Sequence, residues 1–418
     1  MPGAATLATA EGEQAAWPPT RPRRRAGSWP IATSGLTLCC LVSVWLAFVP
    51  LDAAVQHSSS RTTASAPAPD DGWMRAAAGR PIVLPDDHVA HPEYRLEWWY
   101  YTGNVQDKGG RPYGYQVTFF RFGVVREQTN PSPWAVRDLY MAHVAITDPQ
   151  GEGHLFADRV NRAGIHWAGA RTDRYEVWNE TWRVSQDEQG RHHLTVDADD
   201  FAIELVLDEG KPAALHGRGG YSQKGSDAGN ATHYYSLTRM PTRGTLRVGG
   251  QSYEVNGLSW MDHEYGTTFL ERTQAGWDWF SIQLDDGSEL MMFRLRGVDG
   301  SADARSSGTV IAGDGRTRAL DAAAFTLVPG RLWRSAATGA RYPVEWRLSV
   351  PAERLDLVVR AAIDAQELSG LASGVAYWEG AIDVQGTRHG RAMRGRGYLE
   401  MTGYGGRPMG EVMAVPQG

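Results

Sequence analysis

The chain has 418 residues, more than one ordinary hydrophobic core encloses, so we expect two folded domains. Hydrophobic residues make up 42% and charged residues 22% of the sequence, values typical of a globular protein. The net charge of −6, with both signs scattered along the chain, gives no electrostatic basis for binding nucleic acid, and we exclude that partner.

An apolar run over residues 35–51 follows an N-terminal segment that is rich in Ala, Pro and Arg. This order predicts an export signal over residues 1–56, or an uncleaved signal anchor that tethers the protein to a membrane through residues 35–51. Either way, we expect the body to be exported to the periplasm or the extracellular space. The only two cysteines, Cys39 and Cys40, lie in this run, so thiol nucleophiles, zinc–thiolate sites and disulfides are excluded from the folded body.

Short strands dominate the rest of the chain. Residues 57–81, rich in Ser, Ala and Pro, are predicted to be a disordered linker. From residue 82 onward, short runs of strand-forming residues, several alternating apolar with polar, are separated by Gly, Asp and Asn turns. Strands are predicted at 96–105, 113–122, 139–147, 176–185, 192–198, 201–208, 276–284, 289–297, 309–312, 344–350, 355–361, 377–384 and 395–402, with helical turns only at 131–138 and 321–325.

This spacing predicts an all-β protein with two antiparallel β-barrel or sandwich domains. We place the N-terminal domain at residues 82–268, the C-terminal domain at 269–410 and a tail at 411–418. The stretch 257–266 then lies at the junction of the two domains, a place where ligand sites preferentially form.

That stretch, GLSWMDHEYG, holds three charged or titratable residues between aromatic ones. In a strand, side chains alternate between the two faces, so Trp260, Asp262 and Glu264 share one face and His263 faces the other way. A carboxyl group beside an indole in an apolar cavity has its pKa raised by desolvation, which suits a proton donor. Solvated or paired charges near a loop are the alternative.

Similar groups of an acid and aromatic residues recur along the chain, and together they predict an aromatic ligand pocket. Packing in a core is the alternative for each of them. His143 is a further pocket candidate, with a hydrogen-bonded core histidine as the alternative. The candidates are Glu97, Trp98, Trp99 and Tyr101 in the first predicted strand, Trp277 and Trp279 in 276–284, and Trp378 and Glu379 in 377–384.

Other chemistries lack their sequence signals, so we predict no metal and no cofactor. His88, His91 and the pair His192-His193 lack the helical spacing of a zinc motif. The sequence has no nucleophile elbow, P-loop or dinucleotide-binding unit in a suitable context. The glycine-rich residues 217–229 are predicted to form a flexible loop.

The assembled motifs resemble the carotenoid 1,2-hydratase (hydroxyneurosporene synthase-like) and AttH-like family of lipocalin-type proteins. The resemblance covers roughly residues 90–405 and implies two lipocalin-like barrels packed together, with a pocket near their interface. It implies hydratase, lyase or isomerase activities, while exported members are regarded as hydrolases. The matching segments are EWWYYTGNV, QVTFFRF, AHVAITD, HYYSLTRM, GLSWMDHEYG, GWDWFSIQL, YWEG and GRGYLEMTGY.

Acid-catalysed hydration of an isolated C=C bond needs a protonated carboxylic acid, aromatic faces beside the cation and a mostly dry cavity. The resemblance favours Asp262 as the acid, with Glu264 as the alternative and Glu97 as a partner or water-orienting base. Trp99, Trp260 and Trp279 would form walls around a hydrophobic polyene, terpenoid or lipid. A lipid-binding protein without catalysis and a hydrolase with paired carboxylates are the alternative functions.

Overall fold

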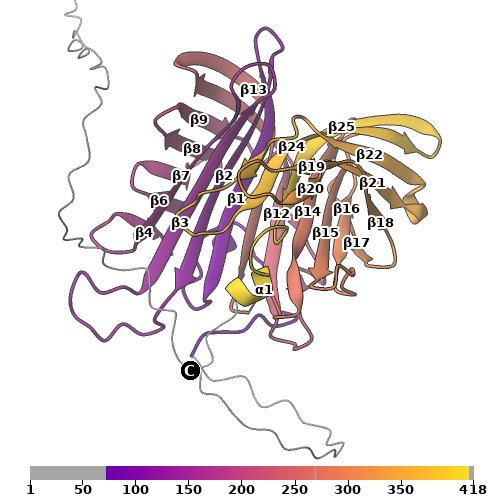
Figure 1. Ribbon diagram of the computed structural model, residues 1–418. Helices are drawn as coiled ribbons and strands as arrows, with labels where there is room; N and C mark the ends of the chain where they lie inside the picture. Colours follow the sequence, from indigo (N-terminus) through magenta and orange to yellow (C-terminus); the bar gives the residue numbers. More distant parts are fainter. Residues whose placement is uncertain (1–71, 269, 414–418) are drawn as a thin grey trace, which may run out of the picture. The chain divides into compact units, whose positions relative to one another are not determined.

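The computed structural model describes residues 72–268 and 270–413, which are almost entirely antiparallel β-sheet (Figure 1). The described residues group as one compact unit. The predicted export signal and residues 57–71 of the predicted linker lie outside the described residues. Within the described part, no helix is long and apolar enough to cross a membrane.

The N-terminal sheet has the strand order β4-β3-β2-β1-β13-β12-β9-β8-β7-β6-β5, and β10 and β11 also pair with β12. Because its two outer strands come close together, it forms a nearly closed barrel. Its strands are β1 (Leu96–Asp107), β2 (Pro112–Gly123), β3 (Asp138–Asp148), β4 (Gly153–Arg162), β5 (Ala168–Ala170), β6 (Glu176–Asn179), β7 (Trp182–Gln186), β8 (His192–Asp197), β9 (Phe201–Leu207), β10 (Ala214–Leu215), β11 (Tyr221–Gln223), β12 (Ala231–Val248) and β13 (Gln251–Gly266).

Side chains, not backbone pairing, close the seam between β4 and β6 in this barrel. The amide of Asn161 donates to the Asn179 side chain at 2.7 Å, and Arg159 donates to the Asn179 carbonyl at 3.2 Å. The barrel interior is apolar over most of its length, with buried Val, Ile, Leu and Tyr side chains from most of its long strands, whereas β4 contributes only partly buried residues.

The C-terminal sheet is a half-barrel with the order β17-β16-β15-β14-β25-β24-β22-β21-β18, and β23 pairs with β24. Its strands are β14 (Gln274–Leu284), β15 (Glu289–Gly297), β16 (Ser307–Ile311), β17 (Thr317–Asp321), β18 (Thr326–Pro329), β21 (Glu345–Val350), β22 (Leu355–Ala361), β23 (Glu367–Leu368), β24 (Tyr377–Arg388) and β25 (Arg391–Met401). The remaining elements are the hairpin β19 (Leu332–Arg334) and β20 (Arg341–Pro343), and the short helices η1 (Asp86–His88), η2 (Pro351–Glu353) and α1 (Met409–Val412).

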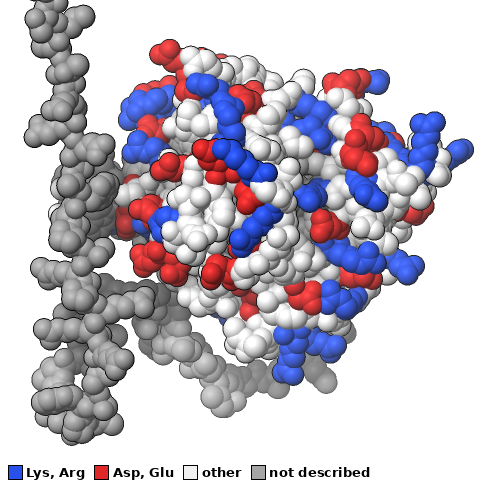
Figure 2. All heavy atoms as spheres, turned by 90° about the horizontal axis from the view of Figure 1, so that it is seen from above, with Lys and Arg blue, Asp and Glu red and all other residues white. Residues whose placement is uncertain are grey.

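The two sheets pack face to face: β1 and β2 contact β24 and β25, and β12 contacts β14. A separate buried cluster fills this interface, including Tyr100, Tyr234, Trp260 and Trp279. On the outer face drawn in Figure 2, acidic and basic side chains are interspersed without a large area of one sign.

Glycine at position 114 allows this close packing. A Cβ atom there would lie 2.7 Å from the Ala381 Cβ and 2.8 Å from the Tyr398 hydroxyl, both in the opposite sheet. We therefore expect Gly114→Ala to lower the free energy of unfolding by about 1–3 kcal/mol, because the sheets must move apart. Thermal unfolding measures this loss, with Gly313→Ala as the control, since a Cβ at Gly313 meets nothing closer than 3.9 Å. Equal melting temperatures for the two variants would contradict the expectation.

The predicted all-β fold and most predicted strands are confirmed, with four local corrections. Residues 176–185 form two strands, because Glu180 adopts a positive φ of 56° and turns the chain. Residues 131–137 and 322–325 contain turns but no helix, and Asp138 and Asp321 belong to β3 and β17. The predicted linker ends earlier than residue 81, since Trp73 and Ala76 are buried. Residues 217–229 are not simply a flexible loop: they include β11, which pairs with β12.

Candidate functional site

Strand β13 lies between β1 and β12 and presents different chemistry on its two faces. Trp260, Asp262 and Glu264 point to the interface between the sheets, whereas His263 and Tyr265 point into the barrel. The predicted alternation along this strand is therefore confirmed. All of these side chains are buried.

Asp262 accepts hydrogen bonds only from neutral groups among the described residues. Trp260 Nε1 donates to Oδ1 at 2.6 Å, Tyr234 donates to Oδ2 at 2.7 Å, and Ser236 also donates to Oδ1. Burial disfavours the charged carboxylate more than these three donors favour it, and the nearby Glu264 adds repulsion, so the pKa of Asp262 is raised to about 7. Asp262 thus holds a proton that it can release near neutral pH.

Glu264, the alternative acid, has a cationic partner. Its carboxylate lies 3.1 Å from the Lys224 ammonium group and accepts a hydrogen bond from Thr232. Burial lowers the pKa of Lys224, and the charge of Glu264 opposes that shift. The two carboxyl groups therefore differ: Glu264 has a cationic partner, whereas the hydrogen-bond donors to Asp262 are neutral.

A chain of hydrogen-bonding groups continues from Asp262. The hydroxyl of Ser236 lies 2.6 Å from His216 Nε2, and His216 Nδ1 lies 2.9 Å from the Thr309 hydroxyl in the C-terminal sheet. Burial lowers the pKa of His216 to about 3, so this imidazole is neutral and can accept or donate through either nitrogen. These contacts connect Asp262, through neutral groups, to the C-terminal sheet.

Two further carboxyl groups, from the C-terminal sheet, lie in the same interface. Tyr100 donates to Glu379 at 2.6 Å, and Trp277 donates to Glu400 at 3.1 Å. Burial raises the pKa of Glu400 to about 7, and burial followed by repulsion from Glu400 raises the pKa of Glu379 well above its usual range. Glu379 Oε2 has no hydrogen-bond partner among the described residues.

Aromatic side chains surround these acids. The Trp279 ring lies edge-on to Trp260 at 6.3 Å between centroids and to Tyr100 at 5.1 Å, and its Nε1 donates to Tyr234 at 2.9 Å. Trp98 and Trp277 pack at the border of the same cluster. The structure thus brings Trp98, Trp260, Trp277, Trp279, Asp262, Glu264 and Glu379 together as expected.

His143 lies in the interface as well, farther along β3. Its Nδ1 is 2.9 Å from the Tyr377 hydroxyl, and its Nε2 has no partner among the described residues. Burial lowers the pKa of His143 to about 4, so the ring is neutral.

Glu97 is not a partner of Asp262, which corrects the prediction. In the pairing of β1 with β13, Glu97 lies opposite Tyr265, and its side chain points into the barrel with Trp99, Tyr101 and His263. Trp99 therefore forms no wall beside Asp262, because the β-sheet separates them.

Trp378 is also misplaced by the prediction. It packs in the core of the C-terminal sheet, where its indole donates to the Asp364 carbonyl at 2.8 Å. Its neighbour Glu379 points the opposite way, as alternation along a strand requires.

Inside the barrel, Glu97 is the centre of a charged network. It accepts hydrogen bonds from the backbone and ring of His91, from Arg121 at 3.1 Å and from His263 at 2.9 Å. Burial alone would raise the pKa of Glu97, but these donors hold it well below its usual range. Glu97 is thus a permanent anion and cannot serve as a general acid.

The neighbours of Glu97 carry balancing charges. Burial opposes protonation of His91, yet its hydrogen bonds to Asp87 and Glu97 raise its pKa to about 9. Arg80 pairs with Asp87 at 2.8 Å, and Arg121 pairs with Asp138 at 3.0 Å. Cations and anions therefore alternate at this end of the barrel, in the order Arg80, Asp87, His91, Glu97, Arg121 and Asp138.

Among the residues that the structure describes, two groups of side chains have the atoms to hold a metal ion: His91, Glu97 and His263 form one, and His88, His192 and Glu209 form the other. In the first group, the ring nitrogens of both histidines hydrogen-bond to carboxylates or Tyr235, and the Arg121 cation lies beside Glu97. That group is a hydrogen-bonded ion network, and a metal ion does not fit there.

Asp262 lines neither of two cavities found beside the sheets. One, of about 400 Å³, lies between the sheets and is lined by residues that include Leu258, Arg239 and Gln283. The other, of about 340 Å³, lies beside Phe156 and Phe201 at β4 and β9. The predicted aromatic groups therefore meet, but side chains fill the space around the acid.

Sequence reasoning missed Lys224, Tyr234, Ser236, His216 and Glu400. Alternation in the matching segments HYYSLTRM and GRGYLEMTGY could have indicated Tyr234, Ser236 and Glu400, because each shares a strand face with an aromatic or polar neighbour. His216 and Lys224 flank a glycine-rich run that carries no periodic signal.

Comparisons with known proteins agree with this architecture. A family model described as AttH-like matches residues 75–404. A solved structure from Nitrosomonas europaea assigned to AttH is 35% identical, with a TM-score of 0.73, and covers 80% of this chain and 100% of that one. The crystal structure of kievitone hydratase from Nectria haematococca shares the fold, with 16% identity, a TM-score of 0.61 and coverage of 79% and 95%.

In sequence, kievitone hydratase of Fusarium solani subsp. phaseoli is 23% identical over 175 residues, which are 41% of this chain and 49% of that protein. The chain thus spans about half the length of this relative. The AttH-like match, by contrast, covers most of the chain and includes both sheets. The chain belongs to the AttH-like family.

Proposed function

We propose that this protein is a hydratase-type enzyme that adds water to, or removes it from, a hydrophobic substrate without a cofactor, with Asp262 as the acid. The substrate class is a polyene, terpenoid or lipid. The sequence similarity to kievitone hydratase supports the reaction type. We further propose that the protein acts outside the cytoplasm, on the basis of the predicted export signal over residues 1–56.

The observation that carries the proposal is the environment of Asp262. Its pKa of about 7 leaves it protonated in a large fraction of molecules at neutral pH. Its direct hydrogen-bond partners are indole, phenol and hydroxyl groups, and none of them is charged. This combination is what protonation of an unactivated double bond requires.

In hydration, the Asp262 proton would form a C–H bond at one alkene carbon as the π bond breaks. The cation on the other carbon would face the rings of Trp260 and Trp279, whose π electrons stabilise positive charge. A water molecule would then form the C–O bond, and its surplus proton would return to the Asp262 carboxylate. The net reaction consumes one water and restores the acid.

Substrate entry requires movement, because side chains occupy the space beside Asp262. The 400 Å³ cavity at the same interface provides a starting point, since its Gln283 also bonds the Ser259 carbonyl three residues before Asp262 on β13. We propose that ligands enter from this cavity by displacing interface side chains.

The test is to purify the full chain from its own membrane extract and to identify co-purified lipids by mass spectrometry. Incubation in oxygen-18 water should then place the heavy isotope in a hydrated product, or release water from a hydrated ligand. A ligand recovered unchanged after long incubation would instead support the lipid-binding alternative and contradict catalysis.

With such a substrate, kcat/KM should be constant below about pH 6 and fall tenfold per pH unit above about pH 8. The sign follows from the acid role: a raised pKa keeps Asp262 protonated at low pH, and the proton is lost as the pH rises through about 7. Glu264→Gln should move the fall in kcat/KM to lower pH, because the charge of Glu264 raises the pKa of Asp262. If the pH at which kcat/KM falls is the same in this variant, a group other than Asp262 controls the pH dependence.

A further inference from the structure

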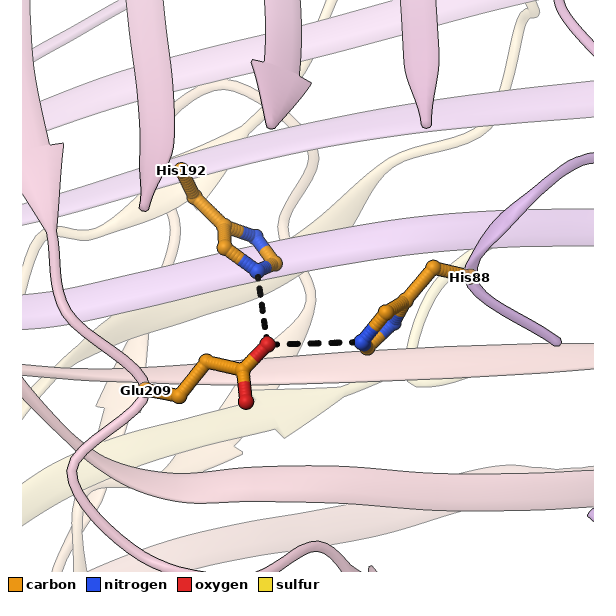
Figure 3. A group of neighbouring side chains, drawn as sticks. All are labelled: His88, His192 and Glu209. Carbon is orange, nitrogen blue, oxygen red and sulfur yellow. Dashed lines mark ion pairs between the residues drawn. The ribbon is translucent and has the colours of Figure 1, made fainter. Parts of the chain in front are cut away.

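Three side chains from distant parts of the chain converge at one end of the N-terminal barrel (Figure 3). His88 ends the short helix η1, His192 begins β8, and Glu209 follows β9. His88 Nε2 lies 3.4 Å and His192 Nε2 lies 3.7 Å from Glu209 Oε1. Zinc–ligand bonds of about 2.0–2.1 Å in a tetrahedron place two ligand atoms about 3.3 Å apart, so both histidine–glutamate distances are close to those around one ion. All three ligand atoms lie within 4.8 Å of one another.

The rings are held so that Nε2 of each histidine faces Glu209. His88 Nδ1 lies 2.7 Å from the Tyr235 hydroxyl, and His192 Nδ1 lies 2.7 Å from the Tyr101 hydroxyl. Partners of this kind on the far nitrogen orient the histidine ligands of metal sites.

The tautomer of His88 follows from its hydrogen-bond chain. Glu97 is an anion, so His263 donates to it through Nε2 and accepts from the Tyr235 hydroxyl, 3.0 Å away, through Nδ1. The Tyr235 oxygen then accepts from His88 Nδ1. His88 Nε2 therefore carries a lone pair, as a metal ligand must.

The site is open on one side. His88 and His192 are buried, but the Glu209 side chain is 41% exposed, so an ion and a water ligand can reach it. The Gln186 amide nitrogen lies 3.0 Å from Glu209 Oε1 and 3.3 Å from His192 Nε2. Turning this amide by half a turn would bring its oxygen to the same place as a fourth donor.

The donor atoms define the class of ion. Imidazole nitrogens with one carboxylate suit Zn²⁺ and similar transition metals, whereas Ca²⁺ and Mg²⁺ prefer oxygen ligands alone. We propose that His88, His192 and Glu209 bind one divalent transition-metal ion of the zinc class. The ion would fasten η1 and the segment after β9 to the rim of the barrel, independently of Asp262 on the other face of the sheet.

The test is a titration of the full chain, after chelation, with Zn²⁺ in a calorimeter and with Co²⁺ in a visible spectrometer. Cys39→Ser and Cys40→Ser should be present throughout, so that these thiols do not compete. We expect one equivalent to bind, a rise in melting temperature on binding, and at least tenfold weaker binding in Glu209→Gln. Tyr101→Phe should weaken binding about tenfold through His192.

His193→Ala is the matched control, because His193 is the exposed neighbour of His192 and pairs with Asp187. It should leave binding unchanged. Glu209→Gln should melt like the metal-free parent, since its side chain is partly exposed, so a folding defect cannot mimic the result. No stoichiometric binding, binding unchanged in Glu209→Gln, or binding lost in His193→Ala would each overturn the proposal.

Discussion

Asp262→Asn is expected to reduce turnover by about 10³-fold while the protein stays folded. A general acid contributes about 10²–10⁴-fold, and an amide has no acidic proton to give. The amide oxygen can still accept from Trp260 and Ser236, so the hydrogen bonds that hold the side chain survive in part. Turnover of the co-purified substrate and the melting temperature are the two measurements.

Ser236→Ala is the matched control for this variant. It removes one donor to Asp262 and the link to His216 but keeps the carboxyl group. Its turnover should lie between those of the parent and Asp262→Asn. Turnover near the parent value in Asp262→Asn would remove Asp262 from the reaction, whatever the substrate.

Arg121→Met is expected to lower the free energy of unfolding by about 3–5 kcal/mol. Arg121 is 1% exposed and pairs with Glu97 and Asp138, and it also donates to the carbonyls of His91 and Tyr94. Its loss leaves two buried carboxylates with fewer partners, which costs far more than the pair contributes in water. Urea denaturation followed by tryptophan fluorescence gives the value.

Arg174→Met is the control, because Arg174 pairs with Glu176 at 2.7 Å while its own side chain is 56% exposed. Exposed pairs contribute about 0–1 kcal/mol, so little change is expected. If both variants lose the same stability, the network around Glu97 is not a source of stability.

The sequence was sufficient for the strands and for the two faces of β13. Alternation depends only on local backbone geometry, so Asp262 and His263 could be assigned to opposite faces without a structure. The same argument could not show which faces of two strands meet. The prediction placed Glu97 and Asp262 in one site, but their side chains lie on opposite faces of the sheet. The strands that carry them are more than 150 residues apart in the chain, and neither segment alone determines the register in which they pair.

The histidine site shows the same limit more strongly. His88, His192 and Glu209 come from a short helix, a strand start and a connecting segment, so their spacing resembles no metal motif. Spacing rules work when one helix or loop supplies the ligands. When the tertiary fold brings ligands together from distant segments, as it does here, the sequence carries no spacing signal. The prediction of no metal site therefore overlooked this cluster.

The side-chain seam between β4 and β6 makes the N-terminal barrel mechanically uneven. Everywhere else along its wall, separating neighbours breaks a ladder of backbone hydrogen bonds, whereas here the bonds of Asn161 and Arg159 to Asn179 join the edges. Each such bond contributes about 1 kcal/mol. The barrel can therefore open between β4 and β6 at a lower free-energy cost than elsewhere, and such an opening leaves the backbone hydrogen bonds of the sheet intact.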